Sequence, residues 1–253
     1  MAETSPGPSA DQAAALPFHG RTGRGVRIAV IDSGAHPGHP HIAADRIGAG
    51  ILVMPDGSLF VEQADTIDRL GHGTAMTAAI QEKAPDATCL PVRVFREALK
   101  ASATALIAAI RWAIEQRVDI VNLSLGSINE MHRAAFARIA DEAKEAGVLL
   151  VAAREANDQP CYPGALPDVL GVGIDWDVPR ERYRTAIGDE AALLYASGYP
   201  RPIPGVPLQR NLYGVSFAVA QVSGFAALAC EASGLRDPAA LRQALVGEAD
   251  RFL

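Results

Sequence analysis

Short apolar runs alternate with longer mixed stretches along most of the chain. The short runs are rich in Val, Ile and Leu and have the length typical of buried strands. We expect strands at residues 26–31, 88–95, 118–125, 148–153 and 169–174. The stretches between them predict helices at residues 74–83, 102–116 and 131–146. Strands that alternate with helices favour an α/β fold, with a mostly parallel sheet and helices on both faces.

The C-terminal part of the chain shows two further patterns. Residues 219–229 form a longer run of small apolar residues, which predicts a buried helix. Asp237 and Pro238 are typical of the N-cap and the first turn of another helix. Residues 180–205 are rich in Arg and Pro, and they predict an irregular surface segment.

Composition narrows the class of protein. With 253 residues, 49% of them hydrophobic, the chain can bury one substantial core. We therefore expect one domain at residues 25–253, after a flexible segment at residues 1–24 that is rich in Ala, Pro, Gly and Ser. The net charge of −6 and the scattered basic residues argue against nucleic acid or an anionic membrane as a partner.

Several features predict a cytoplasmic protein. Residues 1–17 lack the apolar core of a signal peptide. No segment reaches the roughly 18 uninterrupted apolar residues that a spanning helix needs. The three cysteines, Cys89, Cys161 and Cys230, are odd in number and widely spaced, which does not suggest a disulfide framework.

Three residues suggest a catalytic site. Asp32 ends a predicted strand, His72 lies between two glycines, and Ser216 precedes the apolar run at residues 219–229. Ligands of parallel sheets collect at the carboxyl ends of strands, where Asp32 falls. The chain order Asp, His, Ser is one of the known arrangements of a Ser–His–Asp triad. We predict that Ser216 is the nucleophile, that His72 is the general base, and that Asp32 orients His72.

Each of these residues also has a simpler interpretation. Ser216 could cap the helix that follows it. Asp32 could be a turn residue, because Asp-Ser-Gly is also favourable turn chemistry. His72 could begin a helix without any chemical role. The occurrence of all three beside glycines in one order favours the catalytic interpretation.

The sequence resembles the subtilisin-like serine proteases. That family carries an Asp-Thr/Ser-Gly segment, a Gly-His-Gly-Thr segment and a Gly-Thr-Ser-Met-Ala segment, and residues 32–34, 71–74 and 214–218 are similar to them. Further similar segments lie at residues 38–41, 84–94, 122–126, 147–153 and 162–167. The resemblance covers roughly residues 24 to 235, and it implies a single-domain subtilisin-like fold and serine protease activity.

The resemblance also implies where a peptide substrate binds. In the family two segments sandwich an extended peptide, and main-chain hydrogen bonds hold it as an added strand. The first segment matches Ser124, Leu125 and Gly126 well. The second is placed by spacing alone at Leu99, Lys100 and Ala101.

The oxyanion-binding segment departs from the family pattern. The family strand ends in Ala-Gly-Asn, whose Asn side chain donates to the oxyanion, whereas this chain continues Ala153-Arg154-Glu155. A gapless count from Gly147 puts Ala156 at the Asn position, and a one-residue bulge puts Asn157 there. We expect Asn157 to be the side-chain donor, together with the backbone N–H of Ser216.

No metal or other cofactor is expected. The family's main calcium loop follows the helix of the catalytic His, but here residues 80–82 pass directly into Ala84-Pro85. His41 stands where the family has an acidic ligand. His36, His39 and His41 suggest zinc only weakly, because no fourth ligand is evident.

These features predict a cytoplasmic serine endopeptidase that acts on peptides or proteins, and a specialised role in precursor-peptide maturation. Two rival hypotheses remain. The altered oxyanion segment could belong to a peptide-binding pseudoprotease or partner subunit. The same triad could also serve an esterase or a transpeptidase. The sequence does not indicate an oligomeric state.

Overall fold

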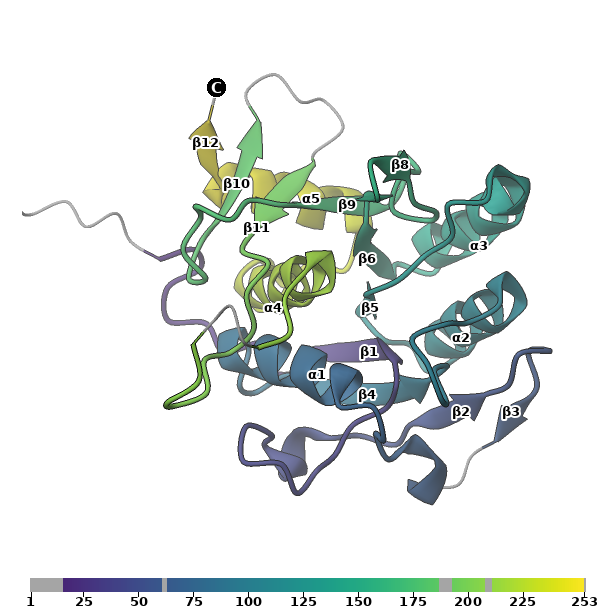
Figure 1. Ribbon diagram of the computed structural model, residues 1–253. Helices are drawn as coiled ribbons and strands as arrows, with labels where there is room; N and C mark the ends of the chain where they lie inside the picture. The colour runs from purple at the N-terminus through teal and green to yellow at the C-terminus, as the bar shows by residue number, and fades with distance from the viewer. Residues whose placement is uncertain (1–15, 61–62, 187–192, 208–210, 253) are drawn as a thin grey trace, which may run out of the picture.

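One large sheet organises the chain. The computed structural model describes residues 16–60, 63–186, 193–207 and 211–252. In this part of the chain ten strands join in a single sheet, and helices cover both of its faces (Figure 1). The predicted α/β fold class, with a mostly parallel sheet, is confirmed.

Five parallel strands form the centre of the sheet. They are β1 (Arg27–Asp32), β4 (Thr88–Arg93), β5 (Ile120–Leu123), β6 (Leu149–Ala153) and β9 (Leu170–Ile174). Each overlaps a run that the sequence predicts as a strand. The spatial order is β9-β6-β5-β1-β4, so β1 lies between β5 and β4. The segments that follow β5 and β4 therefore emerge on either side of Asp32, the last residue of β1.

The edges of the sheet are made of shorter strands. They are β2 (Ile51–Val53) and β3 (Leu59–Phe60) at one edge, and β11 (Leu194–Ala196), β10 (Tyr183–Ala186) and β12 (Asp250–Phe252) at the other. Strands β10 and β11 pair as antiparallel neighbours inside residues 180–205. The prediction of an irregular segment there is wrong for these two strands.

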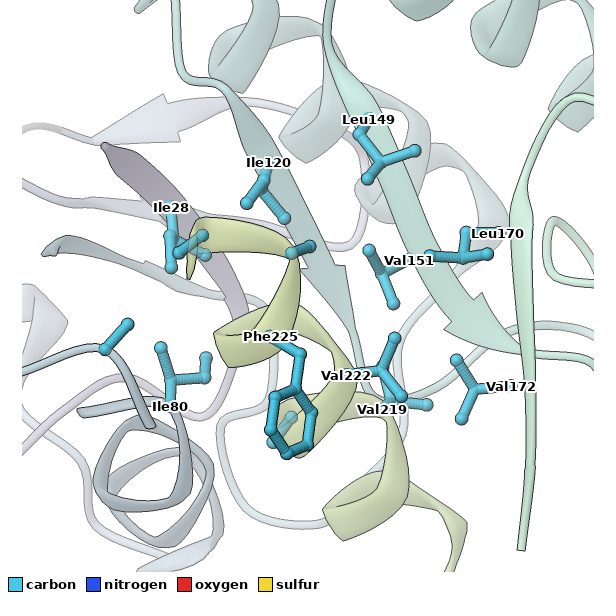
Figure 2. Packing of buried hydrophobic residues seen from close by; sticks show 14 of the residues in the cluster. Ile28, Ile80, Ile120, Leu149, Val151, Leu170, Val172, Val219, Val222 and Phe225 are labelled. Carbon is cyan, nitrogen blue, oxygen red and sulfur yellow. The ribbon is translucent and has the colours of Figure 1, made fainter. Parts of the chain in front are cut away.

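Five α-helices are described, and they form two layers around the sheet. They are α1 (His72–Lys83), α2 (Ala103–Glu115), α3 (Arg133–Glu145), α4 (Val215–Ser233) and α5 (Pro238–Glu248). Alternating residues of β1 divide the core: Ile28 and Val30 face α1 and α4, while Ile31 faces α2 and α3. Figure 2 shows the first of these cores, where Ile28 and its neighbours surround Val222 and Phe225 of α4.

Helix α4 is the central helix of the first core. It extends the predicted run at residues 219–229 in both directions and packs against α1 and against strands β5, β6 and β9. By length and composition alone this helix could cross a membrane, but 83% of its most apolar window is buried inside the protein. Its apolarity is explained by this burial, and its N-terminus carries Ser216.

The described chain begins before the predicted domain boundary. Residues 1–15 of the predicted flexible segment lie outside the described residues. Residues 16–24 are described, and the backbone N–H groups of Thr22 and Gly23 each donate to Glu231 Oε2 over 2.7 Å. These bonds fix this part of the segment to α4.

Candidate active site

Ser216 is held at the start of α4. It is the second residue of the helix, so its backbone N–H lies in the first turn, where no helical acceptor exists. Gly214 precedes the helix with φ of 147°, a conformation that favours glycine, and its N–H donates to Gly198 O over 2.9 Å. The Ser216 hydroxyl and its backbone N–H group thus lie together at the N-terminus of α4.

His72 begins helix α1, and Asp68 holds this helix start in place. The Asp68 carboxylate accepts hydrogen bonds from the backbone N–H groups of Leu70, Gly71 and Thr74 and from the Thr74 hydroxyl. Burial works to raise the pKa of Asp68, but these hydrogen bonds outweigh it and hold that pKa below its ordinary value. A charged Asp68 therefore fixes the turn from which His72 projects.

Asp32 lies at the carboxyl end of β1 and contacts the His72 ring. Its two carboxylate oxygens lie 2.8 and 2.9 Å from His72 Nδ1, and Oδ1 also accepts from the Ser33 N–H. The two chain segments meet closely here, since a Cβ atom on Gly73 would lie 2.2 Å from the carbonyl oxygen of Gly34. The glycine after His72 thereby allows the imidazole to reach β1.

The three side chains form one hydrogen-bonded chain. His72 Nε2 lies 3.2 Å from Ser216 Oγ, on the side of the ring opposite Asp32. All three residues are buried, Asp32 completely. A carboxylate can only accept, so Nδ1 carries a hydrogen and Nε2 of the neutral ring is free to accept from the serine hydroxyl. This arrangement can withdraw a proton from Ser216.

The environment of His72 favours its protonated form. Burial works to lower the pKa of His72. The hydrogen bond and charge of Asp32, with the charge of Asp68, outweigh burial and raise that pKa above its ordinary value. The imidazolium that forms when the ring takes a proton is therefore stabilised in place.

The predicted substrate-binding segments lie on either side of Asp32. Ser124, Leu125 and Gly126 follow β5, and Leu99, Lys100 and Ala101 lie between β4 and α2. A Cβ atom on Gly126 would lie 2.3 Å from the carbonyl oxygen of Tyr162, so the first segment packs directly against the next loop. Leu99 is exposed, at 42% of its full area. Both segments thus follow the strands that neighbour β1, and their substrate-binding role stays a prediction.

Asn157 lies in a hairpin that the sequence pattern did not predict. Strands β7 (Glu155–Ala156) and β8 (Gln159–Pro160) flank it, and it is exposed. Asn157 and Asp158 have φ values of 51° and 58°, as a two-residue hairpin turn requires. The Asn-Asp pair was the available signal for this turn. The structure therefore has a hairpin in place of the expected one-residue bulge, and the donor role of Asn157 stays a prediction.

The three cysteines are buried, and the histidine-rich turn is the segment for which the sequence suggests zinc only weakly. Burial raises the pKa of Cys161 to about 11 and the pKa values of Cys89 and Cys230 to about 12, so all three are thiols at neutral pH. Within the described residues, no group of three or more His, Cys, Asp or Glu side chains is arranged to hold a metal ion.

Two contributors to the site are not evident from the sequence pattern. Asp68 fixes the start of α1, and the Ser33 hydroxyl accepts from the Gly73 N–H over 2.8 Å. No motif marks Asp68, although an acidic residue shortly before a predicted helix is a known capping signal. Ser33 belongs to the Asp-Ser-Gly motif, so the sequence indicates that it lies near the site. The sequence does not indicate its hydrogen bond with the Gly73 N–H.

A Ser–His–Asp hydrogen-bond chain at the carboxyl end of a central strand of a mostly parallel sheet is an arrangement of serine peptidases. Residues 23–177 match the family model of the subtilase family, and the chain belongs to this family of subtilisin-like serine peptidases, which are hydrolases. The resemblance noted in the sequence is thereby confirmed.

Curated relatives support this assignment. The chain is 29% identical over 224 residues to an intracellular serine protease of Paenibacillus polymyxa, a match that covers 81% of this chain and 67% of the relative. It is 30% identical over 229 residues to the major intracellular serine protease of Bacillus subtilis (strain 168), a match that covers 83% of this chain and 69% of that relative. It spans 58% of the length of subtilisin NAT from Bacillus subtilis subsp. natto, at 28% identity over 86% of this chain.

Solved structures share the fold. Sphericase superimposes with a TM-score of 0.71 at 24% identity, over 90% of this chain and 84% of that one. A lanthipeptide protease superimposes with a TM-score of 0.65 at 21% identity, over 86% of this chain and 78% of that one. At these identities the likeness establishes the subtilisin-like fold alone.

Proposed function

We propose that the chain is a serine endopeptidase that cleaves peptide bonds through Ser216, His72 and Asp32. The observation that carries the proposal is the continuous hydrogen-bonded chain from Asp32 through His72 to the Ser216 hydroxyl. Family membership and the two segments that flank Asp32 support it.

The proposed reaction proceeds through an acyl-enzyme. Ser216 Oγ attacks the scissile carbonyl carbon while its proton passes to His72 Nε2. The resulting tetrahedral oxyanion is stabilised by backbone N–H groups at the start of α4. Collapse of this intermediate breaks the peptide C–N bond, and His72 returns the proton to the leaving amine. Water, activated by the same histidine, then hydrolyses the ester.

The proposed substrate is a specific peptide, bound in extended form. Two segments could hold its backbone, Ser124–Gly126 and the loop at Leu99–Ala101. One of these segments contains the exposed Leu99 (42%), and the chain that follows the other carries the exposed Ile128 (50%) and Met131 (87%). Exposed apolar groups beside a bound peptide are suited to select apolar substrate residues. We therefore propose maturation of a precursor peptide as the role of the enzyme, within the cytoplasm, as the names of the intracellular relatives suggest.

Activity is expected to fall as the pH is lowered through the raised pKa of His72. Protonated His72 cannot accept the serine proton, and its pKa lies above the ordinary value near 6.5. The same raised pKa affects folding stability in the opposite direction. Its contribution to the free energy of unfolding is fully present at a pH below the unfolded-state pKa, and it is lost as the pH rises through the folded-state pKa. Measured kcat/KM should thus decline on mild acidification while thermal unfolding shows an intact fold. A kcat/KM that stays constant from pH 8 to about pH 5.5 would contradict this assignment of the base.

Asn157→Ala is expected to lower kcat by roughly 100- to 1000-fold if the side chain donates to the oxyanion, with little change in KM. The matched control is Asp158→Ala, at the neighbouring turn position with a similar φ value. If both variants lower kcat by the same small factor, the hairpin turn only supports the fold. Backbone N–H groups would then be the remaining oxyanion donors.

The proposed activity is tested by incubating the protein with a peptide library and sequencing the products by mass spectrometry. New termini in the wild type, absent with Ser216→Ala, are the expected result. The rival hypothesis is a peptide-binding pseudoprotease, which the hairpin in place of the family's Gly-Asn segment favours. It predicts peptide binding that survives Ser216→Ala and no cleavage by a folded wild type.

A further inference from the structure

A cavity of about 300 Å³ lies beside the candidate active site. Three segments line it: the histidine-rich turn after β1, the start of α1, and the chain that leads to Ser216. The lining includes Gly71, which directly precedes His72, and Leu212, four positions before Ser216. His72 and Ser216 do not line the cavity themselves, but the chain segments that carry them contribute to its wall.

This cavity lies on the side opposite the proposed binding site for the acyl part of the substrate. Segment Leu99–Ala101 leads into α2, and Ser124–Gly126 leads towards α3. The cavity instead contacts Thr74 and Ala75 of α1, on the other face of the sheet. A peptide that passes the two segments and crosses Ser216 would continue into this cavity with the residues that follow the scissile bond.

The lining of the cavity is cationic. It includes two arginines, Arg69 and Arg201, and a single carboxylate, together with the histidines His36, His39 and His41. The carboxylate is Asp68, and both of its oxygens accept hydrogen bonds from the adjoining turn and from Thr74. Within the described residues neither Arg69 nor Arg201 is paired with a carboxylate, although Arg201 Nη1 donates to His41 O over 3.0 Å.

The pKa of His41 is affected by burial first and by nearby positive charge second. Burial lowers the pKa of His41 first, and the charges of Arg201 and His39 lower it further, against the opposing charge of Glu82. Guanidinium groups bind carboxylates in paired hydrogen bonds, and a cleft lined by one sign of charge concentrates ions of the other sign.

We propose that this cavity recognises a carboxylate on the leaving-group part of the substrate. The inference rests on the proposed peptidase function, and it assigns Arg69 and Arg201 as residues that determine specificity. Two sources could supply the carboxylate: the side chain of an Asp or Glu residue after the scissile bond, or the free carboxyl terminus of a short leaving peptide.

The test measures binding, so that it does not depend on turnover. Fluorescein-labelled peptide pools are prepared as matched pairs. Some pairs differ only in having Glu or Gln at one position, which is varied in turn, and others differ only in having a free or an amidated carboxyl terminus. Their affinities for Ser216→Ala are measured by fluorescence anisotropy. We expect about tenfold tighter binding for the carboxylate member of one pair. A Glu-over-Gln preference identifies the side chain, and a free-over-amide preference identifies the terminus.

Arginine variants in the Ser216→Ala background assign the preference to the cavity. Arg69→Gln, at an exposed position, and Arg201→Gln should each reduce the preference several-fold. Arg138→Gln, an exposed position on α3, is the matched control and should leave it unchanged. The proposal is overturned if no pair differs by more than twofold, or if the preference persists in the Arg69→Gln/Arg201→Gln double variant. Failure of the peptidase proposal is seen separately, as an absence of cleavage by the wild type.

Discussion

Ser216→Ala is expected to reduce peptide hydrolysis on the order of a millionfold, the scale of loss seen when the nucleophile of subtilisin is removed. The hydroxyl 3.2 Å from His72 Nε2 is the group that forms the acyl-enzyme, and alanine has no atom to replace it. Only direct attack by water, aided by the oxyanion donors, would remain. The change is small and lies at the helix start, so the fold and peptide binding should survive.

The measurement compares kcat/KM of the two proteins on one peptide identified from the library. Ser233→Ala is the matched control, since Ser233 lies at the far end of the same helix and donates to Ala229 O over 2.8 Å. It should keep wild-type activity. A Ser216→Ala protein that retained more than about 1% of the wild-type rate would exclude this serine as the nucleophile.

Asp32→Asn is expected to lower kcat by about ten-thousandfold while leaving the geometry of the site intact. The Asp32 carboxylate accepts from Nδ1 and leaves Nε2 free to take the serine proton. An amide can donate to Nδ1 instead, which stabilises the tautomer with hydrogen on Nε2. The histidine is then present but holds its proton on the wrong nitrogen. The charge that raises the pKa of His72 is lost as well.

Two readouts separate this effect from a loss of structure. Asp45→Asn, at an exposed carboxylate in the 3₁₀ helix Ala44–Arg46, is the control and should retain full activity. The Asp32→Asn protein should bind substrate peptide with near wild-type affinity and show partial recovery of kcat at alkaline pH. Unchanged kcat would show that Asp32 is only a turn residue at the end of β1.

The centre of the fold was predictable because local sequence decides it. The run at residues 26–31 is apolar on both faces of its strand, as a strand buried between two helix layers must be. Because Asp32 directly follows this run, its place at the carboxyl edge of the sheet follows from the sequence alone. The start of α1 and of α4 followed from glycine-flanked segments next to helical runs. The grouping of Asp32 with His72 and Ser216 followed from the chain order of the three motifs and from the family resemblance.

The parts that were missed depend on contacts between distant segments. Strand β12 pairs with β10, and Asp250 lies opposite Arg184, a partner that no local pattern identifies. Such short edge strands owe their conformation to the sheet they join. Asp68 acts through bonds to Gly71 and Thr74 that exist only when α1 is folded. The hairpin at Asn157 does not follow from the family pattern, because that pattern suggests a bulged strand end at this point.

The central claim is that His72 and Asp32 activate Ser216. Intact-mass analysis after treatment with a fluorophosphonate tests it most directly, because the reagent phosphonylates an activated serine with release of fluoride. We expect a single adduct on the wild type and none on Ser216→Ala, with slow labelling of Asp32→Asn. A folded wild type that gains no adduct, or an adduct that persists on Ser216→Ala, would contradict it.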